Sequence, residues 1–125
     1  YIDDIVEGIV RIMQHAPEKK NGDDGLPIPP YKVYNIGNSS PENLLDFVNI
    51  LQEELVYAGV LSTHYDFEAH KELVPMQPGD VPVTCADISA LENDFGFKPH
   101  TSLREGLQKF VEWYKKNTDE MVSFS

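Results

Sequence analysis

The segment over residues 74–87, VPMQPGDVPVTCAD, carries two polar side chains, Gln77 and Asp80, on a backbone rich in proline. Each proline fixes φ, lacks an N–H and biases the residue before it away from helix, so residues 76–81 are predicted to form a loop or a sheet edge. Because a stiff loop loses little entropy on binding, Gln77 and Asp80 could hydrogen-bond a ligand from nearly fixed positions. A surface crossover between two elements is the alternative interpretation.

Other residue types that could do chemistry lack suitable partners in the sequence. Cys85 is the only cysteine, so neither an internal disulfide nor a soft metal site is expected. Its neighbours favour a strand in which the thiol is buried as a small hydrophobe rather than acting as a nucleophile. Asn21, Asp23 and Asp24 lack the alternating spacing and the terminal glutamate of a calcium loop. We therefore expect no metal site.

The histidines and the adjacent carboxylates are interpreted as polar surface. The four histidines lack the spacing of metal ligands: His15, His64, His70 and His100. Adjacent carboxylates point in different directions on a helix or lie in a loop, as at Asp3-Asp4, Asp23-Asp24 and Glu53-Glu54. The chain also has no GxGxxG, no phosphate loop, no GxSxG and no Tyr followed four residues later by Lys. No catalytic or cofactor-binding residue is therefore predicted.

Charge and length limit the classes of partner. The chain has 125 residues and a formal net charge of -11 at pH 7. Nucleic acids and anionic membranes are not expected as partners, since both require clustered Lys and Arg, and a phosphate-bearing ligand would need cations from elsewhere. The length predicts a single domain over residues 1–125. No run approaches the roughly 18 apolar residues of a membrane helix and no signal peptide is recognisable, so a cytoplasmic protein is expected.

Helices alternating with strands predict an α/β fold. The first helix is expected to begin at an Asp3 or Asp4 cap, to end at Ala16 and to bury an apolar stripe made of Ile5, Val6, Ile9, Val10 and Met13. Further helices are expected from the Ser40-Pro41 start to Gly59, from the Asp87 cap to Gly96, and from a Ser102–Glu105 capping box to Lys116. Residues 117–125 are expected to fray.

Two strands are expected between these helices. Residues 32–37, KVYNIG, are β-branched and aromatic and predict a buried strand. Residues 63–70, THYDFEAH, alternate and predict a half-exposed strand. Residues 17–31 are rich in turn formers and predict a long surface loop.

Four motifs in succession carry a family resemblance: YIDDIVEGIVR at residues 1–11, YNIGNSSPENLLDFV at 34–48, PMQPGDVPVTCADISAL at 75–91 and FGFKPHTSLREGLQKFVEWYKK at 95–116. They resemble the C-terminal portion of the extended short-chain dehydrogenase/reductase family, and within it the UDP-glucuronate 4-epimerases. The resemblance implies a two-part enzyme. Its N-terminal half would hold NAD and the catalytic Tyr and Lys, and its smaller C-terminal part, represented here, would bind the nucleotide sugar.

The resemblance implies a reaction and an assembly for the longer protein. Hydride would pass from C4 of the sugar to NAD and return to the other face of the keto intermediate. The longer protein would be a homodimer, and an arginine preceding Tyr1 would approach the UDP phosphates. This chain alone is expected neither to bind NAD nor to catalyse the reaction.

Only two positions carry over as binding residues. In related epimerases the loop reads Arg-x-Gly-Asp, with the arginine on the diphosphate and the aspartate accepting from ribose hydroxyls. Asp80 matches that aspartate, whereas Gln77 stands at the arginine position, as in the glucuronate enzymes. Two alternatives stay open: a dehydratase or decarboxylase of the same family, and a non-catalytic acidic binding module. An Asx-type turn with Gly79 is the competing structural role for Asp80.

Overall fold

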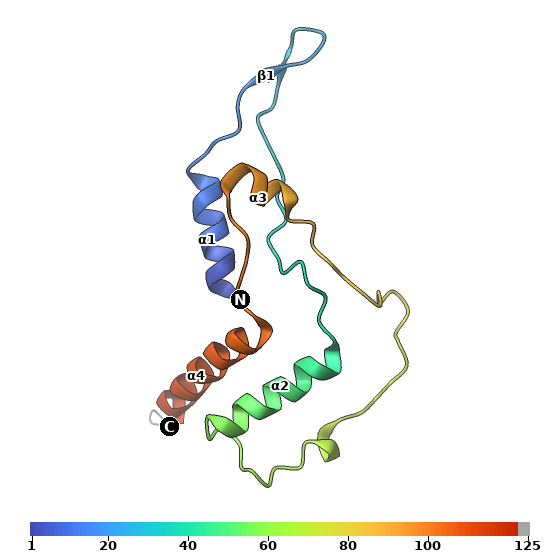
Figure 1. The fold of residues 1–125 in the computed structure, drawn as a ribbon, viewed down its shortest axis with the longest axis vertical. Coiled ribbons are helices and arrows are strands. Elements are labelled where there is room, and N and C mark those ends of the chain that lie inside the picture. Colours follow the sequence, from blue (N-terminus) through green and yellow to red (C-terminus); the bar gives the residue numbers. More distant parts are fainter. Residues whose placement is uncertain (123–125) are drawn as a thin grey trace. The chain divides into compact units, whose positions relative to one another are not determined.

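Figure 1 shows the computed structural model, which describes residues 1–122 and the side chains of residues 1–118. This part of the chain forms four α-helices, a short 3₁₀ helix and a two-stranded antiparallel sheet, which confirms the α/β class. Its contacts divide it into two compact units, Tyr1–Pro41 with Thr84–His100 and Glu42–Val83 with Thr101–Ser125. Each unit is described by itself below, and the expectation of a single domain stays a prediction.

The first unit is built on α1 (Ile2–Met13) and α3 (Ser89–Phe95), which contact each other. Its buried apolar side chains are Ile88, Leu91 and Phe97. Glycine at position 8 permits a close approach, because a Cβ there would lie 3.0 Å from Cδ1 of Ile36 and 3.3 Å from the ring of Phe97. α1 therefore packs directly on the segment that follows the loop at residues 17–31.

The start of α1 differs from the prediction. The helix begins after Tyr1, and no side chain caps it. Asp4 is buried instead, and its carboxylate accepts a long hydrogen bond of 3.4 Å from the backbone N–H of His100. The prediction that Asp3 or Asp4 caps this helix was wrong, because the Asp4 carboxylate bonds to a distant backbone group rather than to the first turn.

The loop at residues 17–31 contains a small hairpin that the sequence did not predict. β1 (Lys20–Asn21) pairs antiparallel with β2 (Pro27–Ile28), with Lys20 opposite Ile28. The turn is closed by the Gly25 N–H donating to the Gly22 carbonyl at 2.9 Å. These strands have only two residues each, too few to give an alternating pattern.

Two strand predictions in the first unit were wrong. Residues 32–37 are not assigned to a strand, and neither are residues 84–87 around Cys85. Cys85 is exposed, and its Sγ donates to the Ser39 carbonyl at 3.3 Å. A strand requires a hydrogen-bonded neighbour, and no other described segment pairs with either stretch.

The second unit is built on α2 (Leu44–Tyr57) and α4 (Leu103–Val122), which pack against each other. Leu107 and Val111 of α4 are buried at this contact. Arg104 donates to Glu54 at 2.5 Å and to Glu53 at 2.6 Å, and these two hydrogen bonds, that to Glu53 first, raise the pKa of the guanidinium. The two glutamates thus share one partner. The prediction that this pair is polar surface was wrong for Glu54, which is buried, whereas Glu53 is exposed.

The ends of these helices show which capping signals were correct. The Ser102 hydroxyl accepts from the Glu105 N–H at 3.2 Å, as the capping box predicts. α2 begins later than expected, because the Asn43 side chain, not Ser40, accepts from the first turn, with 2.8 Å to the Leu45 N–H. α4 continues to Val122, so the prediction of fraying was wrong for residues 117–122, and residues 123–125 lie outside the described residues.

Residues 63–70 form turns and the 3₁₀ helix η1 (Glu68–His70) instead of the predicted strand. The Asp66 carboxylate accepts from the Ala69 N–H at 3.1 Å, which favours a helical turn. The Tyr65 ring stacks on His70 with ring centroids 5.1 Å apart. These local contacts outweigh the alternating pattern, since no neighbouring strand in the described part of the chain is available to pair.

Candidate functional site

The proline-rich segment forms a defined turn at residues 77–80. As predicted, residues 76–81 contain no helix, and each of these six residues is exposed. The Asp80 N–H donates to the Gln77 carbonyl at 3.1 Å, and Gly79 has a φ of 96°. Proline at the second position and a positive-φ glycine at the third are the features of a type II β-turn. Gln77 and Asp80 therefore stand at the two ends of one turn.

The side chains of Gln77 and Asp80 differ in their hydrogen bonds to the rest of the described protein. Nε2 of Gln77 donates to the Pro75 carbonyl at 2.9 Å, which orients its carboxamide. No residue that the structure describes donates a hydrogen bond to the Asp80 carboxylate. The turn is closed by the backbone N–H of Asp80, so the alternative Asx-type role for its side chain is not observed. The carboxylate is thus available to accept hydrogen bonds from a ligand.

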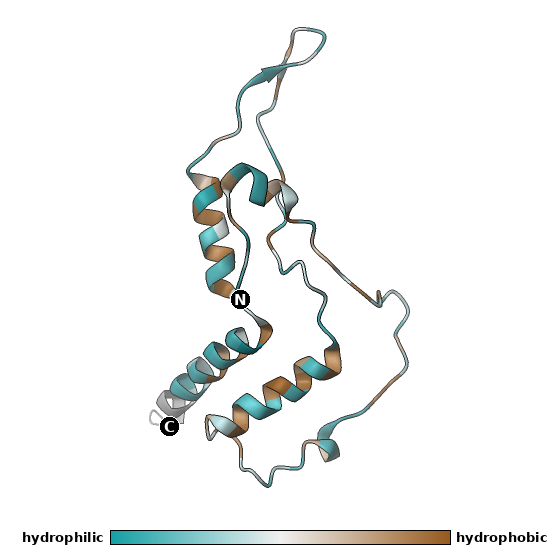
Figure 2. Cartoon of the chain, in the orientation of Figure 1, coloured by the Kyte–Doolittle hydropathy of each residue, from teal (hydrophilic) through white to brown (hydrophobic). Residues whose placement is uncertain are grey.

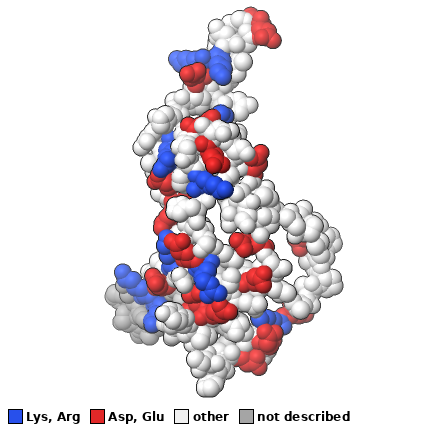
Figure 3. Space-filling model, in the orientation of Figure 1, with Lys and Arg blue, Asp and Glu red and all other residues white. Residues whose placement is uncertain are grey.

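An exposed carboxylate on a stiff turn suits one kind of ligand chemistry. Its two oxygens can accept from two adjacent hydroxyl groups, and charge-assisted hydrogen bonds of this type are stronger than neutral ones. The turn offers nothing for a phosphate, because residues 74–83 contain no Lys or Arg. Lys71, the nearest cation before the segment, is paired with Glu68 at 2.6 Å. On the face drawn in Figure 3, Lys and Arg lie among Asp and Glu rather than in a separate patch.

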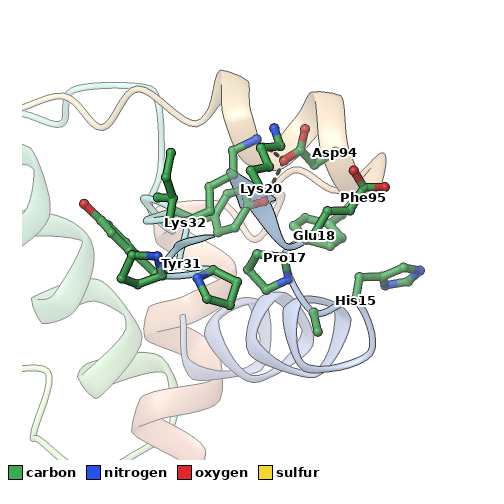
Figure 4. Close-up of a pocket in the computed structure, with 13 residues that line it drawn as sticks. His15, Pro17, Glu18, Lys20, Tyr31, Lys32, Asp94 and Phe95 are labelled. Carbon is green, nitrogen blue, oxygen red and sulfur yellow. Dashed lines mark hydrogen bonds and ion pairs between the residues drawn. The ribbon is translucent and has the colours of Figure 1, made fainter. Parts of the chain in front are cut away.

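The first unit contains a cavity of about 490 Å³ that does not involve Gln77 or Asp80 (Figure 4). Asp94 lies at one side of it and accepts from the Lys32 ammonium and, at 2.6 Å, from the Tyr34 hydroxyl. The Phe95 ring contacts the Tyr34 ring edge-on, with centroids 5.1 Å apart. The sequence does not predict this cluster, because Asp94 lies 62 residues from Lys32 and 60 residues from Tyr34. The only sequence signal for the cluster is that Lys32 and Tyr34, two residues apart, would lie on the same face of an extended segment.

The ionisable groups of the cavity stabilise one another's native charge state. The hydrogen bond from Lys32, and then that from Tyr34, lower the pKa of Asp94. The hydrogen bond to Asp94 raises the pKa of Lys32 and also that of Tyr34. All three groups are satisfied by each other, so the cluster serves to join the segment at residues 32–34 to α3.

The histidines are exposed, as predicted, and each described contact is local or structural. Nδ1 of His15 lies 3.2 Å from the Arg11 carbonyl, and Nδ1 of His70 lies 2.8 Å from the Asp66 carbonyl. His100 lies beside the buried Asp4. Within residues 1–122, no group of three or more His, Cys, Asp or Glu side chains is placed to hold a metal ion.

Dinucleotide cofactors bind where a glycine-rich turn connects a strand to a helix N-terminus. The only sheet in the described part of the chain is the hairpin of β1 and β2, which leads into no helix.

No helix within residues 1–122 has the length and apolar character needed to cross a membrane.

Comparisons with known proteins identify relatives along nearly the whole chain. Protein CapI of Staphylococcus aureus is 42% identical over 120 residues, which are 91% of this chain and 33% of that protein. UDP-glucuronate 4-epimerase 4 of Arabidopsis thaliana is 41% identical over 117 residues, 91% of this chain and 24% of the relative. A probable UDP-glucuronate 4-epimerase of Rhizobium meliloti is 38% identical over 124 residues, 94% of this chain and 33% of the relative. The chain thus spans a quarter to a third of each relative. No family model matches it.

Proposed function

We propose that this chain, a homologue of one part of the UDP-glucuronate 4-epimerases, is the nucleotide-sugar-binding part of such an enzyme. The similarity to proteins named as UDP-glucuronate 4-epimerases, at 38 to 44% identity over at least 91% of the chain, is the observation that carries the proposal. The exposed, unengaged carboxylate of Asp80 on a preorganised turn supports it. A ribose diol is the part of a UDP-sugar that such a carboxylate would bind.

In this proposal the chemistry belongs to residues outside the chain. NAD would be bound, and the catalytic groups supplied, by the remaining two thirds or more of the longer protein. Cations for the diphosphate would come from there too, because residues 74–83 supply none. Gln77 would contribute a neutral hydrogen bond, worth about 0.5 to 1.5 kcal/mol against about 1.5 to 3 for a charged one.

The test of function uses the polypeptide encoded by the full gene. We expect it to convert UDP-glucuronate to its C4 epimer, as followed by NMR of the sugar protons, and the isolated 125-residue chain to show no turnover. Loss of water or of carbon dioxide from the sugar would favour the dehydratase or decarboxylase. Absence of any turnover with UDP-sugars would favour the non-catalytic module.

The test of the site is the substitution Asp80→Ala in the full-length protein. Losing a charged hydrogen bond should cost about 1.5 to 3 kcal/mol of UDP-glucuronate affinity, a factor of about 10 to 150 in Kd. Asp23→Ala, which removes an exposed carboxylate from the hairpin turn, is the matched control and should bind normally. Calorimetry measures both, and an unchanged Kd for Asp80→Ala would remove Asp80 from the site.

A further inference from the structure

The cavity in the first unit has the size of a small-molecule site. Its volume of about 490 Å³ lies within the range of about 300 to 1,000 Å³ that such sites occupy. All of its lining residues belong to the first unit, and they occupy positions 15–18, 20, 28–32, 34 and 94–95 (Figure 4). The hydrogen bonds from Lys32 and Tyr34 to Asp94 join two of its walls, so the cavity is held in shape by the chain itself.

The apolar stripe of α1 is another uncovered surface of this unit, but it specifies no ligand. Four of its five predicted members are 44 to 79% exposed, so the prediction that they are buried was wrong within this chain: Val6, Ile9, Val10 and Met13. Figure 2 shows hydrophobic residues along α1. An apolar face has no hydrogen-bonding groups that select a ligand, whereas the cavity combines apolar and charged side chains.

The hairpin and the segment after it supply an apolar surface to the cavity. Pro29, Pro30 and Tyr31 directly follow β2, and the Tyr31 side chain is exposed. The Tyr31 N–H donates to the Pro29 carbonyl at 3.0 Å, and this γ-turn fixes the course of the chain between them. The face of an aromatic ring is electron-rich, so it attracts the weakly positive C–H groups on the face of a saturated ring.

Two charged side chains at the cavity have no partner within the described part of the chain. Lys20 pairs with Ile28 across the hairpin, so both side chains lie on the face that lines the cavity. Neither the Lys20 ammonium nor the Glu18 carboxylate forms an ion pair or a side-chain hydrogen bond with another described residue. Lys32, in contrast, is paired with Asp94. The unpaired donors and acceptors of the cavity are therefore those of Lys20 and Glu18.

This balance of charge selects the ligand. Lys20 can donate a charge-assisted hydrogen bond to a carboxylate, and Glu18 can accept from hydroxyl groups. A nucleoside diphosphate would bring several negative charges close to Glu18 and Asp94, and like charges in contact are unfavourable. A sugar acid carries one negative charge, several hydroxyl groups and a saturated ring, so it matches each group that the cavity offers.

We propose that this cavity is a second ligand site and that it binds a monosaccharide acid such as glucuronate. The carboxylate lies on Lys20, hydroxyl groups donate to Glu18, and the C–H face of the ring packs on Tyr31. The cavity belongs to the first unit and the turn at residues 77–80 to the second, so the two sites share no residue. Binding here requires neither a nucleotide nor turnover, and the inference therefore goes beyond the proposed function.

Methyl NMR of the full-length protein tests the proposal, with UDP in excess to occupy the nucleotide-sugar site. The δ1 methyl of Ile28, in the cavity wall, should shift as glucuronate is added, with a Kd on the order of 1 mM. Glucose has the same ring but no carboxylate, so it should bind at least about tenfold more weakly. Absence of a shift at about 50 mM glucuronate, or equal affinities for the two sugars, would overturn the proposal. A protein that binds glucuronate here but converts no UDP-sugar would refute the proposed function alone.

Two pairs of variants identify the groups that hold the ligand. Lys20→Gln should weaken glucuronate binding by at least about tenfold, whereas Lys19→Gln, at the adjacent lysine that does not line the cavity, should not. Tyr31→Ala should weaken binding by about 2- to 12-fold, and Tyr57→Ala, which removes an exposed tyrosine of α2, is its control. Equal effects of Lys20→Gln and Lys19→Gln would show that surface charge in general attracts the sugar acid, and would overturn the proposal.

Discussion

The turn at residues 77–80 predicts an unusual sensitivity at Gly79. Its φ of 96° lies in the left-handed region, which an alanine adopts only at a cost of about 1 to 2 kcal/mol. A Cβ at this position would meet no atom within 4 Å, so Gly79→Ala creates no steric clash with the rest of the protein. The whole effect of the substitution is therefore backbone strain.

The magnitude of the effect follows from what holds the turn. One backbone hydrogen bond, from Asp80 to Gln77, closes it and contributes about 1 kcal/mol. The strain equals or exceeds this contribution, so in Gly79→Ala the turn opens, and global stability falls by no more than about 1 kcal/mol. Binding UDP-glucuronate must then order the backbone again at about 1 to 2 kcal/mol for one residue, which weakens Kd by about 5- to 30-fold.

Calorimetry with UDP-glucuronate and urea unfolding of the full-length protein measure the two quantities. Gly25→Ala is the matched control, because Gly25 also has a positive φ, 76°, and also leaves a Cβ in open space, but it lies in the hairpin. It should leave Kd unchanged. Gly79→Asn should retain most of the affinity, since asparagine tolerates this region. Equal Kd values for Gly79→Ala and the native protein would refute the argument that the turn preorganises Asp80.

Three predictions concern stability, all measured by urea unfolding. Leu91 is 0% exposed, so Leu91→Ala should cost about 2 to 5 kcal/mol, and a loss below 1 kcal/mol would contradict its place in the core of the first unit. Asn43→Ala should cost about 1 kcal/mol and Asn43→Asp much less, because aspartate also caps helices; equal losses would argue against the cap. The lowered pKa of Asp94 makes its contribution complete above about pH 4 and lost as pH falls through the folded-state pKa. The raised pKa of Tyr34 makes its contribution complete below about pH 10 and lost as pH rises through the folded-state pKa. Asp94→Asn should therefore flatten the pH profile of stability at both ends, and an unchanged profile would rule out this coupling.

The helices were largely predictable because their signals are local. Gly96 ends α3 with a left-handed φ of 59°, and the Ser102 hydroxyl caps α4, both as the sequence indicates. The start of α2 was predicted too early, because Ser40 and Asn43 are both residues that can cap a helix. Asn38 accepts from the Ser40 N–H, which leaves Asn43 to cap the helix.

Strands were predicted poorly because they depend on distant partners. Residues 32–37 have the composition of a strand and no neighbour among the described residues, and residues 63–70 follow the Asp66 cap into η1. For the same reason the Lys32–Tyr34–Asp94 cluster could not be found, since its members meet only after folding. The turn at residues 77–80 was accessible to sequence reasoning, since proline and glycine encode it locally.

The single exposed thiol of Cys85 has a practical consequence for spectroscopy. The chain has one cysteine and one tryptophan, Trp113, and these lie in different units. Both side chains are exposed. A maleimide dye on Cys85 can serve as the acceptor, and the indole of Trp113 as the donor, in an energy-transfer measurement, so the 125-residue sequence already contains a donor and an attachment point. Fluorescence lifetimes of Trp113 would then report the distance between the two units, and its change on adding UDP-glucuronate, without any substitution.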